Sequence, residues 1–321
     1  MDEKKITYKR VLLKLSGEAL SGDAGTGLDF KVMAEVCGVV AQCAKQGVEV
    51  GIVVGGGNFW RGVKNGEGRM DRWRADYMGM LATVMNCLAL QDVLQQQGVE
   101  AKVLTAMEIQ HIGEPFSVEK ADEYLRSGKV VVFGGGVGSP FFTTDTGAVL
   151  RAALIGADAV LLAKNVDGVY SADPKKDPNA VRFDSLTYEE VLEKRLAVMD
   201  STATCIAMDN RIPIKVFALR EPENILRAAR GEIDRRFRRK PLLHELAMLD
   251  RIVDQLVPLV AAAVMDLRAG LRAAQRRGSL QRRQDIQRPR GLEEDRRSVL
   301  HLHKAERRIL HLERLGIPGT K

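Results

Sequence analysis

The feature that most constrains the fold is an alternation of short apolar segments with longer segments of helical periodicity over residues 1–232. Most of the short segments are continuous apolar runs, which is typical of strands that are buried on both faces of a sheet. Strands followed by helices predict βαβ units. The predicted strands are 10–15, 48–54, 101–105, 129–133, 158–163 and 214–218. We therefore expect an α/β fold, a three-layer α/β/α sandwich with a mostly parallel central sheet.

Helix boundary signals lie between these strands. Ser117 and Thr187 are suitable N-caps, and Thr187 with Glu190 matches a capping box. Glycines that follow a helical pattern favour its termination. Helices are predicted over 30–46, 76–97, 145–155 and 223–230, and a further helix begins at Ser201.

The charge of the chain is divided unevenly. The net charge is +7, but residues 233–321 carry 21 Lys and Arg against 11 Asp and Glu, whereas residues 1–232 carry a small negative balance. The tail also has a single aromatic residue, Phe237. We predict one folded domain over 1–232 and an arginine-rich tail over 233–321, with no closing strand after the last helix.

The nature of the tail is open at the level of the sequence. Its leucines between 242 and 256 follow helical spacing, and its arginines could contact nucleic acid phosphates. The interpretation we favour is a disordered or weakly helical segment, or the product of a translation that left its frame near Gly231.

Cysteine usage and the start of the chain indicate a cytoplasmic protein. The four cysteines form no CxxC pair, which favours free thiols in a reducing compartment. The first residues hold no apolar segment of a secretory signal, and no run of eighteen apolar residues predicts a membrane span.

Four loops rich in glycine or small residues each follow a predicted strand, at 14–20, 53–62, 133–148 and 165–174. The carboxyl ends of parallel strands meet at one edge of a sheet, so these loops should converge there. Bare main chain in such loops lets N–H groups approach an anion. With Lys14 and Arg61 nearby, the pattern predicts a phosphate site.

Several chemistries are excluded by the same motifs. There is no Walker A sequence, no GxGxxG after the first strand and no credible hydrolytic triad. The only histidine before the tail, His111, lies in a polar loop that indicates a surface role. Lysine, arginine and carboxylates around phosphate are typical of phosphoryl transfer, which depends on positioning and charge neutralisation.

Six motifs together resemble the bacterial uridylate (UMP) kinases of the amino acid kinase superfamily. They are "KRVLLKLSGEAL", "GGGNFWRG", "DYMGMLATVMN", "GSPFFTTDTGA", "VDGVYSADP" and "VMDSTA", in unbroken order over residues 8–231. The resemblance implies a nucleoside monophosphate kinase that transfers the γ-phosphate of ATP to UMP in pyrimidine nucleotide biosynthesis. It further implies Mg²⁺ carried by ATP rather than by a protein metal site, a homohexamer, activation by GTP and inhibition by UTP.

The resemblance also implies roles for individual residues. Catalytic roles fall to Lys14, Arg61, Asp145 and Asp200. ATP would be bound by Lys14, Leu15, Ser16, Gly17, Gly57, Arg61, Asn165, Tyr170 and Asp173. UMP would be bound by Gly56, Asp76, Val137, Gly138, Ser139, Pro140, Phe141, Phe142, Thr143 and Thr144. GTP control is associated with Gly22, Asp23, Ala24, Gly25, Thr26 and Gly27.

Some roles have structural alternatives that the sequence does not decide. Asp200 could serve only as an N-cap, Tyr170 could be ordinary packing, and Phe141 and Phe142 could be core residues. Two other functions also stay open. One is a kinase of the same fold with a carboxylate or carbamate acceptor, and the other is a nucleotide-sensing protein whose basic tail contacts nucleic acid.

Overall fold

The computed structural model describes residues 6–61, 69–164, 166–172, 174, 176–196, 198–233 and 236–238. The chain divides into two units, Met1–Lys240 and Pro241–Lys321. All described residues belong to the first unit. The leucines at 242–256 and the rest of the predicted tail from 239 onward lie outside the described residues.

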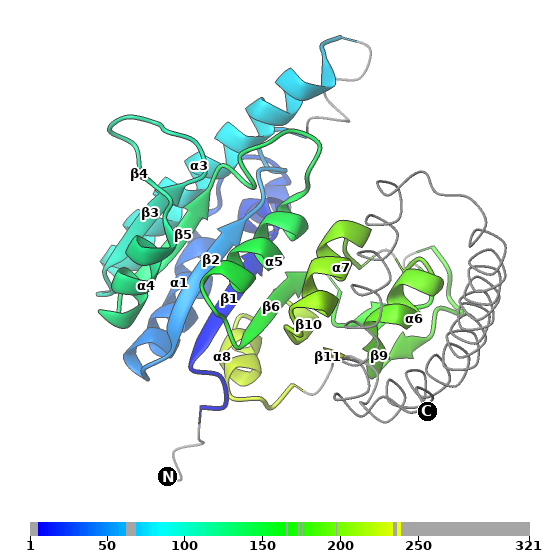
Figure 1. Ribbon diagram of the computed structural model, residues 1–321. Coiled ribbons are helices and arrows are strands. Elements are labelled where there is room, and N and C mark those ends of the chain that lie inside the picture. Colours follow the sequence, from blue (N-terminus) through cyan, green and yellow to red (C-terminus); the bar gives the residue numbers. More distant parts are fainter. Residues whose placement is uncertain are drawn as a thin grey trace, which may run out of the picture. The chain divides into compact units, whose positions relative to one another are not determined.

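A nine-stranded sheet forms the centre of the first unit (Figure 1). Its order is β4–β3–β5–β2–β1–β6–β10–β11–β9, and every pair is parallel except β10 with β11. The strands are β1 Arg10–Leu15, β2 Glu49–Val54, β3 Ala101–Thr105, β4 Glu114–Pro115, β5 Val130–Gly134, β6 Ala159–Lys164, β9 Ser185–Thr187, β10 Ile214–Ala218 and β11 Arg236–Arg238. A separate antiparallel hairpin pairs β7 (Val169–Tyr170) with β8 (Arg182–Phe183).

Helices cover both faces of this sheet, which confirms the three-layer prediction. The helical elements are η1 Gly17–Ala24, α1 Phe30–Lys45, α3 Arg72–Gln96, α4 Val118–Arg126, α5 Thr144–Leu154, α6 Tyr188–Glu193, α7 Ser201–Asp209 and α8 Asn224–Ala229. Buried residues of α1, α3 and α8 share one core, and those of α4, α5, α6 and α7 share the other. In β1, Leu13 and Leu15 face the first core and Leu12 the second, because successive side chains point to opposite faces.

Local sequence signals explain most element boundaries. The six predicted strands appear within one residue at either end. Ser117 accepts a hydrogen bond from Lys120 N, and Thr187 with Glu190 forms the predicted capping box. Helix α3 begins at Arg72, four residues before the predicted start at 76. The first turn of α3 carries two arginines and lacks apolar periodicity, so the sequence pattern did not predict that it is helical.

Helix α3 passes the length and composition test for a membrane span, with a mean hydropathy of 1.2 over a window that is 50% buried within the protein. Among the described residues no other helix does so. Its buried side packs on α1 and the sheet, as expected of a core helix in a soluble protein.

The prediction that no closing strand follows the last helix is wrong. Strand β11 pairs antiparallel with β10, Ile214 opposite Phe237, and parallel with β9. The sheet therefore extends into the segment assigned to the tail. Strand pairing needs only main-chain N–H and C=O groups, so an arginine-rich segment without proline can fill an open sheet edge.

The described cysteines are free thiols, as predicted, and Cys37, Cys43 and Cys87 are buried. Burial raises the pKa of the Cys37 thiol to about 12, which keeps it protonated at neutral pH.

Arg10 ties four elements together at the amino edge of the sheet. Its guanidinium donates to Glu49 Oε2 at 2.5 Å and to the Ile155 carbonyl at 2.6 Å, and it lies 2.9 Å from Asp122 Oδ1. The side chains of Arg10 and Glu49 are only 14% and 13% exposed. These ion pairs raise the pKa of Arg10, although its burial acts in the opposite direction.

We expect Arg10→Met to lower the free energy of unfolding by about 3 kcal/mol, because it leaves the Glu49 carboxylate buried without its cation. Urea denaturation measures the effect. Arg126→Met is the matched control, since Arg126 also pairs with Asp122 but is 72% exposed and should matter little. Equal losses in the two variants would contradict the prediction.

Candidate active site

A cavity of about 510 Å³ opens at the carboxyl ends of β1, β2 and β5. This is the edge at which the glycine-rich loops were predicted to converge. The cavity lies between the end of β1 with η1, the turn after β2, helix α3, and the loop from β5 into α5. Its lining includes Lys14, Ser16, Gly17, Glu18, Gly55, Gly56, Gly57, Trp60, Arg61, Asp76, Gly79, Met80, Thr83, Gly136, Val137, Ser139, Phe142, Thr143 and Thr144.

Three charged side chains form a buried cluster at the centre of this edge. Lys14 Nζ lies 2.7 Å from Asp145 Oδ1, and Lys164 Nζ lies 3.4 Å from Asp145 Oδ2. Lys14 comes from the end of β1, Asp145 from the first turn of α5 and Lys164 from the end of β6. The fold therefore brings together one carboxylate and two ammonium groups, so the three side chains carry an excess positive charge.

The pKa values follow from this geometry. Burial alone would raise the pKa of Asp145, but Lys14 and Lys164 lower it below its ordinary value. Burial lowers the pKa of Lys164, an effect that Asp145 opposes and Lys14 reinforces. The cluster is thus held together by the ionised carboxylate.

The glycine turn, residues 55–57 after β2, has two kinds of glycine. A Cβ on Gly56 would lie 2.7 Å from the Gly79 carbonyl and 2.8 Å from Ala82 Cβ, so the packing of α3 requires glycine there. A Cβ on Gly57 would meet only side-chain atoms at ordinary contact distances, Arg61 Nε at 3.4 Å and Glu18 Cγ at 3.5 Å. Packing therefore does not require glycine at Gly57, and its bare main chain borders the cavity.

Asp76 borders the cavity from the second turn of α3. Arg72 Nε donates to both of its oxygens, at 2.8 and 2.9 Å, and Phe141 N donates to Oδ2 at 2.9 Å. Phe141 has φ +72° and its ring is 66% exposed, which excludes the core alternative for this residue. The Arg72 guanidinium lies 5.6 Å from the centre of that ring. Phe142 is also exposed and lines the cavity.

Asp200 joins the N-termini of two helices. Its Oδ1 accepts from Ala203 N as the N-cap of α7, so the cap that the sequence left as one of two alternatives is present. The hydroxyls of Thr143 and Thr146 also donate to its carboxylate. Thr143 in turn caps α5 by accepting from the N–H groups of Asp145 and Thr146. Asp200 therefore positions the start of α5 rather than contacting Lys14 directly.

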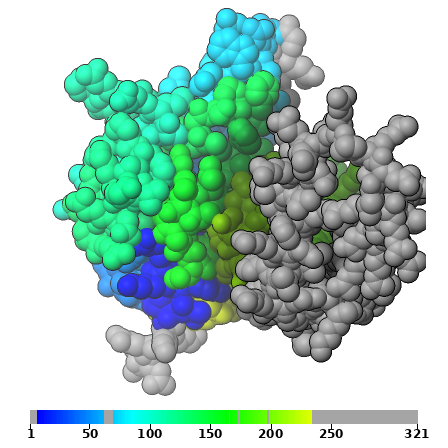
Figure 2. Space-filling view, in the orientation of Figure 1, coloured from blue at the N-terminus to red at the C-terminus, as the bar shows by residue number. Residues whose placement is uncertain are grey.

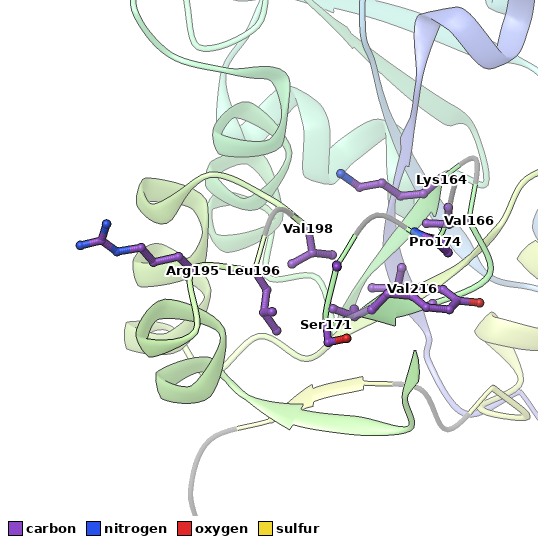
Figure 3. Close-up of a pocket in the computed structure, with 12 residues that line it drawn as sticks. Lys164, Val166, Ser171, Pro174, Arg195, Leu196, Val198 and Val216 are labelled. Carbon is purple, nitrogen blue, oxygen red and sulfur yellow. The ribbon is translucent and has the colours of Figure 1, made fainter. Parts of the chain in front are cut away.

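A second cavity, of about 450 Å³, lies beyond Lys164 (Figure 3). Leu196, Val198 and Val216 form an apolar part of its lining, and Arg195 points away from it. Tyr170 also lines it, and Tyr170 Oη donates to Asp167 Oδ1 at 2.6 Å. The Lys14–Asp145–Lys164 cluster lies between the two cavities, because Lys14 lines the first and Lys164 the second.

Several predicted site residues lie elsewhere. Leu15 has its side chain fully buried in the core, and its carbonyl accepts from Gly55 N. Gly138, Pro140 and Phe141 belong to the loop but are not among the residues lining the first cavity. Asn165 and Asp173 lie outside the described residues. Residues 22–27 line neither cavity, and His111 is an exposed loop residue that also lines neither.

Three residues at the site were not predicted from the sequence: Lys164, Glu18 and Thr83. Glu18 forms an ion pair with Arg61. The hydroxyl of Thr83 accepts from Gly135 N at 2.8 Å and so ties α3 to the loop after β5. For Lys164 a signal existed, since a lysine at the end of an apolar strand repeats the pattern of Lys14.

A mostly parallel sheet whose carboxyl edge carries buried lysines and a glycine turn is typical of an α/β enzyme that handles phosphate groups. The model of the amino acid kinase family matches residues 9–218. The UMP kinase of Bacillus anthracis is 38% identical at a TM-score of 0.68, over 72% of this chain and 94% of its own. The chain belongs to the amino acid kinase family.

Two further solved structures are similar. The UMP kinase of Ureaplasma parvum is 34% identical at a TM-score of 0.67, over 73% of this chain and 99% of its own. The uridylate kinase of Archaeoglobus fulgidus is 32% identical at a TM-score of 0.55, over 69% of this chain and 95% of its own. Within the family, the likeness is therefore to enzymes that phosphorylate a nucleoside monophosphate.

We expect Asp145→Asn to lower the pKa of Lys164 further, because the substitution removes the charge that opposes the effect of burial. The Lys164 ammonium would then lose its proton at a lower pH than in the unsubstituted protein. NMR titration of the lysine side-chain carbons measures this. Asp92→Asn on the exposed face of α3 is the control, and an unchanged Lys164 titration in Asp145→Asn would contradict the geometry.

The same carboxylate makes a pH-dependent contribution to stability. Since the pKa of Asp145 is lower in the folded state, its contribution is present above the unfolded value near 3.8 and is lost as the pH falls through the folded value.

Proposed function

We propose that the protein transfers the γ-phosphate of ATP to UMP, giving UDP and ADP. The observation that carries the proposal is the position of the Lys14–Asp145–Lys164 cluster between two cavities. One cavity can take the acceptor nucleotide and the other the base of the donor. The transferring phosphoryl group would then lie beside the two ammonium groups. The likeness to solved UMP kinases supports uridine as the acceptor base.

The proposed chemistry is direct in-line transfer with no covalent enzyme intermediate. Lys14 and Lys164 neutralise negative charge on the phosphoryl group, and Arg61 at the mouth of the cavity contacts the phosphates of both nucleotides. Asp145 does not act as a base, because both of its oxygens face lysines. Its role is to hold the two ammonium groups apart and in place. Such transfer depends on positioning and electrostatic stabilisation.

The two nucleotides are assigned by the chemistry of the cavity walls. UMP occupies the first cavity, with its ribose hydroxyls donating to Asp76 and its base beside the loop 137–144. ATP places its base in the second cavity against Leu196, Val198 and Tyr170. The N–H groups of Gly57 and Gly17 contact phosphate oxygens. Mg²⁺ arrives with ATP, as part of the substrate.

The proposed regulation involves the segment 22–27, which lies next to the glycine turn. GTP is proposed to activate the enzyme through residues 22–27, and UTP to inhibit it. Thr26 and Gly27 in this segment contact Asn58, which directly follows the glycine turn. A ligand there could therefore affect the phosphate site. The enzyme is proposed to act in the cytoplasm, in pyrimidine nucleotide synthesis.

The experiment for this function measures ADP release from ATP with and without UMP. We expect UMP-dependent turnover, and we expect Lys14→Ala or Arg61→Ala to lower kcat by about 10²-fold or more, since each removes a charge that stabilises the transition state. Lys31→Ala, an exposed lysine on α1, is the matched control and should leave kcat unchanged.

The alternative functions give different outcomes. A higher kcat/KM for N-acetylglutamate, aspartate or carbamate than for UMP would assign a carboxylate or carbamate acceptor. ATP binding without any acceptor-dependent turnover would indicate a nucleotide sensor. Near-normal rates in both Lys14→Ala and Arg61→Ala would overturn the assigned roles.

We also propose that the enzyme is a homo-oligomer, a homohexamer by its resemblance, and that one face of α3 takes part in assembly. Large apolar side chains follow this face at helical spacing and are exposed to between 36% and 51%. The α3 stripe comprises Trp73, Tyr77, Met78, Leu81, Met85 and Leu88. The start of α3 also stands out from the rest of the first unit (Figure 2). Contiguous apolar surface of this kind is typical of a protein interface.

We expect Leu81→Glu with Met85→Glu to reduce the oligomer to a smaller species, because two charges would be buried in the contact. Analytical ultracentrifugation measures the change. Phe30→Glu is the control, since Phe30 is even more exposed, at 60%, but lies on α1, outside the stripe. An unchanged sedimentation coefficient in the double variant would exclude the stripe from the interface.

A further inference from the structure

Two asparagines form a buried amide pair beneath the glycine turn. Asn58 follows the turn and Asn86 lies in α3, and they are 2% and 0% exposed. Asn58 Nδ2 donates to Asn86 Oδ1 at 3.0 Å, and Asn86 Nδ2 donates to Asn58 Oδ1 at 2.8 Å. Neither residue is among those lining the first cavity. The pair is therefore not placed to contact a nucleotide.

The second N–H of each amide holds a main-chain carbonyl. Asn86 Nδ2 donates to Gly55 O at 2.7 Å, and Asn58 Nδ2 donates to Gly27 O at 2.7 Å. Every side-chain donor of the pair thus has a partner, as buried amides require. One end of the pair is fixed to the glycine turn and the other end to the segment that follows η1.

The bond to Gly55 O sets the direction of the next N–H group. A trans peptide is planar, and its C=O and N–H point in opposite directions. Holding Gly55 O toward Asn86 therefore turns Gly56 N–H away from α3. Within the described part of the chain, no protein group accepts from Gly56 N–H or Gly57 N–H. Both glycines line the cavity, so their donors are available to a ligand.

Asn58 also connects the turn to residues 26 and 27. Its carbonyl accepts from Gly27 N at 3.0 Å and from Thr26 Oγ1 at 3.0 Å. A Cβ on Gly17 would lie 2.6 Å from Asn58 Oδ1, so η1 also packs directly on the pair. The side chains of Asn58 and Asn86 therefore fix the positions of three segments that are distant in sequence.

We propose that Asn58 and Asn86 are positioning residues for phosphoryl transfer, which fix the glycine turn with its N–H groups directed at the nucleotide phosphates. The inference rests on the proposed function, because it assigns those N–H groups a role in that reaction. Preorganised main-chain donors stabilise charge only when they are already aimed at it. The pair supplies this alignment without touching the substrate.

The test uses the full chain with Asn86→Leu, which keeps the approximate size of the side chain and removes both donors. We expect kcat to fall about tenfold or more, and the KM for UMP to rise by a smaller factor because Gly56 is the glycine assigned to UMP. We also expect the affinity for ATP, measured by calorimetry without an acceptor, to fall about tenfold. Gln91→Met is the matched control on the same helix. Gln91 Nε2 donates to Ala101 O at 3.0 Å, at the other end of the sheet, so both constants should stay unchanged.

A smaller substitution keeps the proposal testable if Asn86→Leu does not fold. Thr26→Val removes a single hydroxyl that donates to Asn58 O, at an exposed position. It should lower kcat about two- to threefold with the KM for UMP unchanged. Normal kcat in folded Asn86→Leu, or an equal loss in Gln91→Met, would overturn the proposal.

The design separates this inference from the proposed function. If the unsubstituted protein shows no UMP-dependent turnover, the proposed function fails, and ATP affinity then decides the inference. A tenfold loss of ATP affinity confined to Asn86→Leu supports the amide pair, and equal ATP affinity in all variants overturns it.

Discussion

The buried contact of Asp145 with Lys14 and Lys164 is the constraint on which the site depends. Two ammonium groups in a poorly hydrated place repel each other, and burying either is costly unless a counter-charge is near. Asp145 supplies that charge from the first turn of α5, and Thr143 and Asp200 fix this turn by capping two helices. The position of the lysines is therefore set by the sheet, and the Asp145 carboxylate opposes the effect of burial on the pKa of Lys164. Because two ammonium groups share one carboxylate, the cluster keeps a net positive charge that can attract a phosphate group.

The fold could be predicted from the sequence because its signals are local. Continuous apolar runs marked the strands, and caps such as Thr187 marked helix starts. Two features were not predicted. The first turn of α3 has no apolar periodicity, although its arginines form ion pairs with Asp71 and Asp76, three and four residues away. Strand β11 forms because β10 and β9 leave main-chain groups open on either side of it, which composition cannot reveal.

The site was predictable as a set of loops but not as a set of contacts. The glycine turn was expected to be bare for phosphate alone. In the structure the approach of α3 requires glycine at Gly56, whereas packing does not require it at Gly57, and both glycines line the cavity. Lys164 repeats the strand-end pattern of Lys14, but its contact with Asp145 is visible only in the folded structure. Asn86 ends the motif DYMGMLATVMN, but the motif gives no indication of which carbonyl its amide holds.

Helix α3 links these separate features. One side of it packs against the sheet and receives Gly56, and the same helix presents Asn86 to the glycine turn and Asp76 to the cavity. Its other side carries the exposed stripe around Leu81 and Met85. Backbone hydrogen bonds join each turn of an α-helix to the next. The residues proposed to bind substrate and those proposed to form the assembly contact therefore lie on one continuous element, so a substitution on either face of α3 can affect the other.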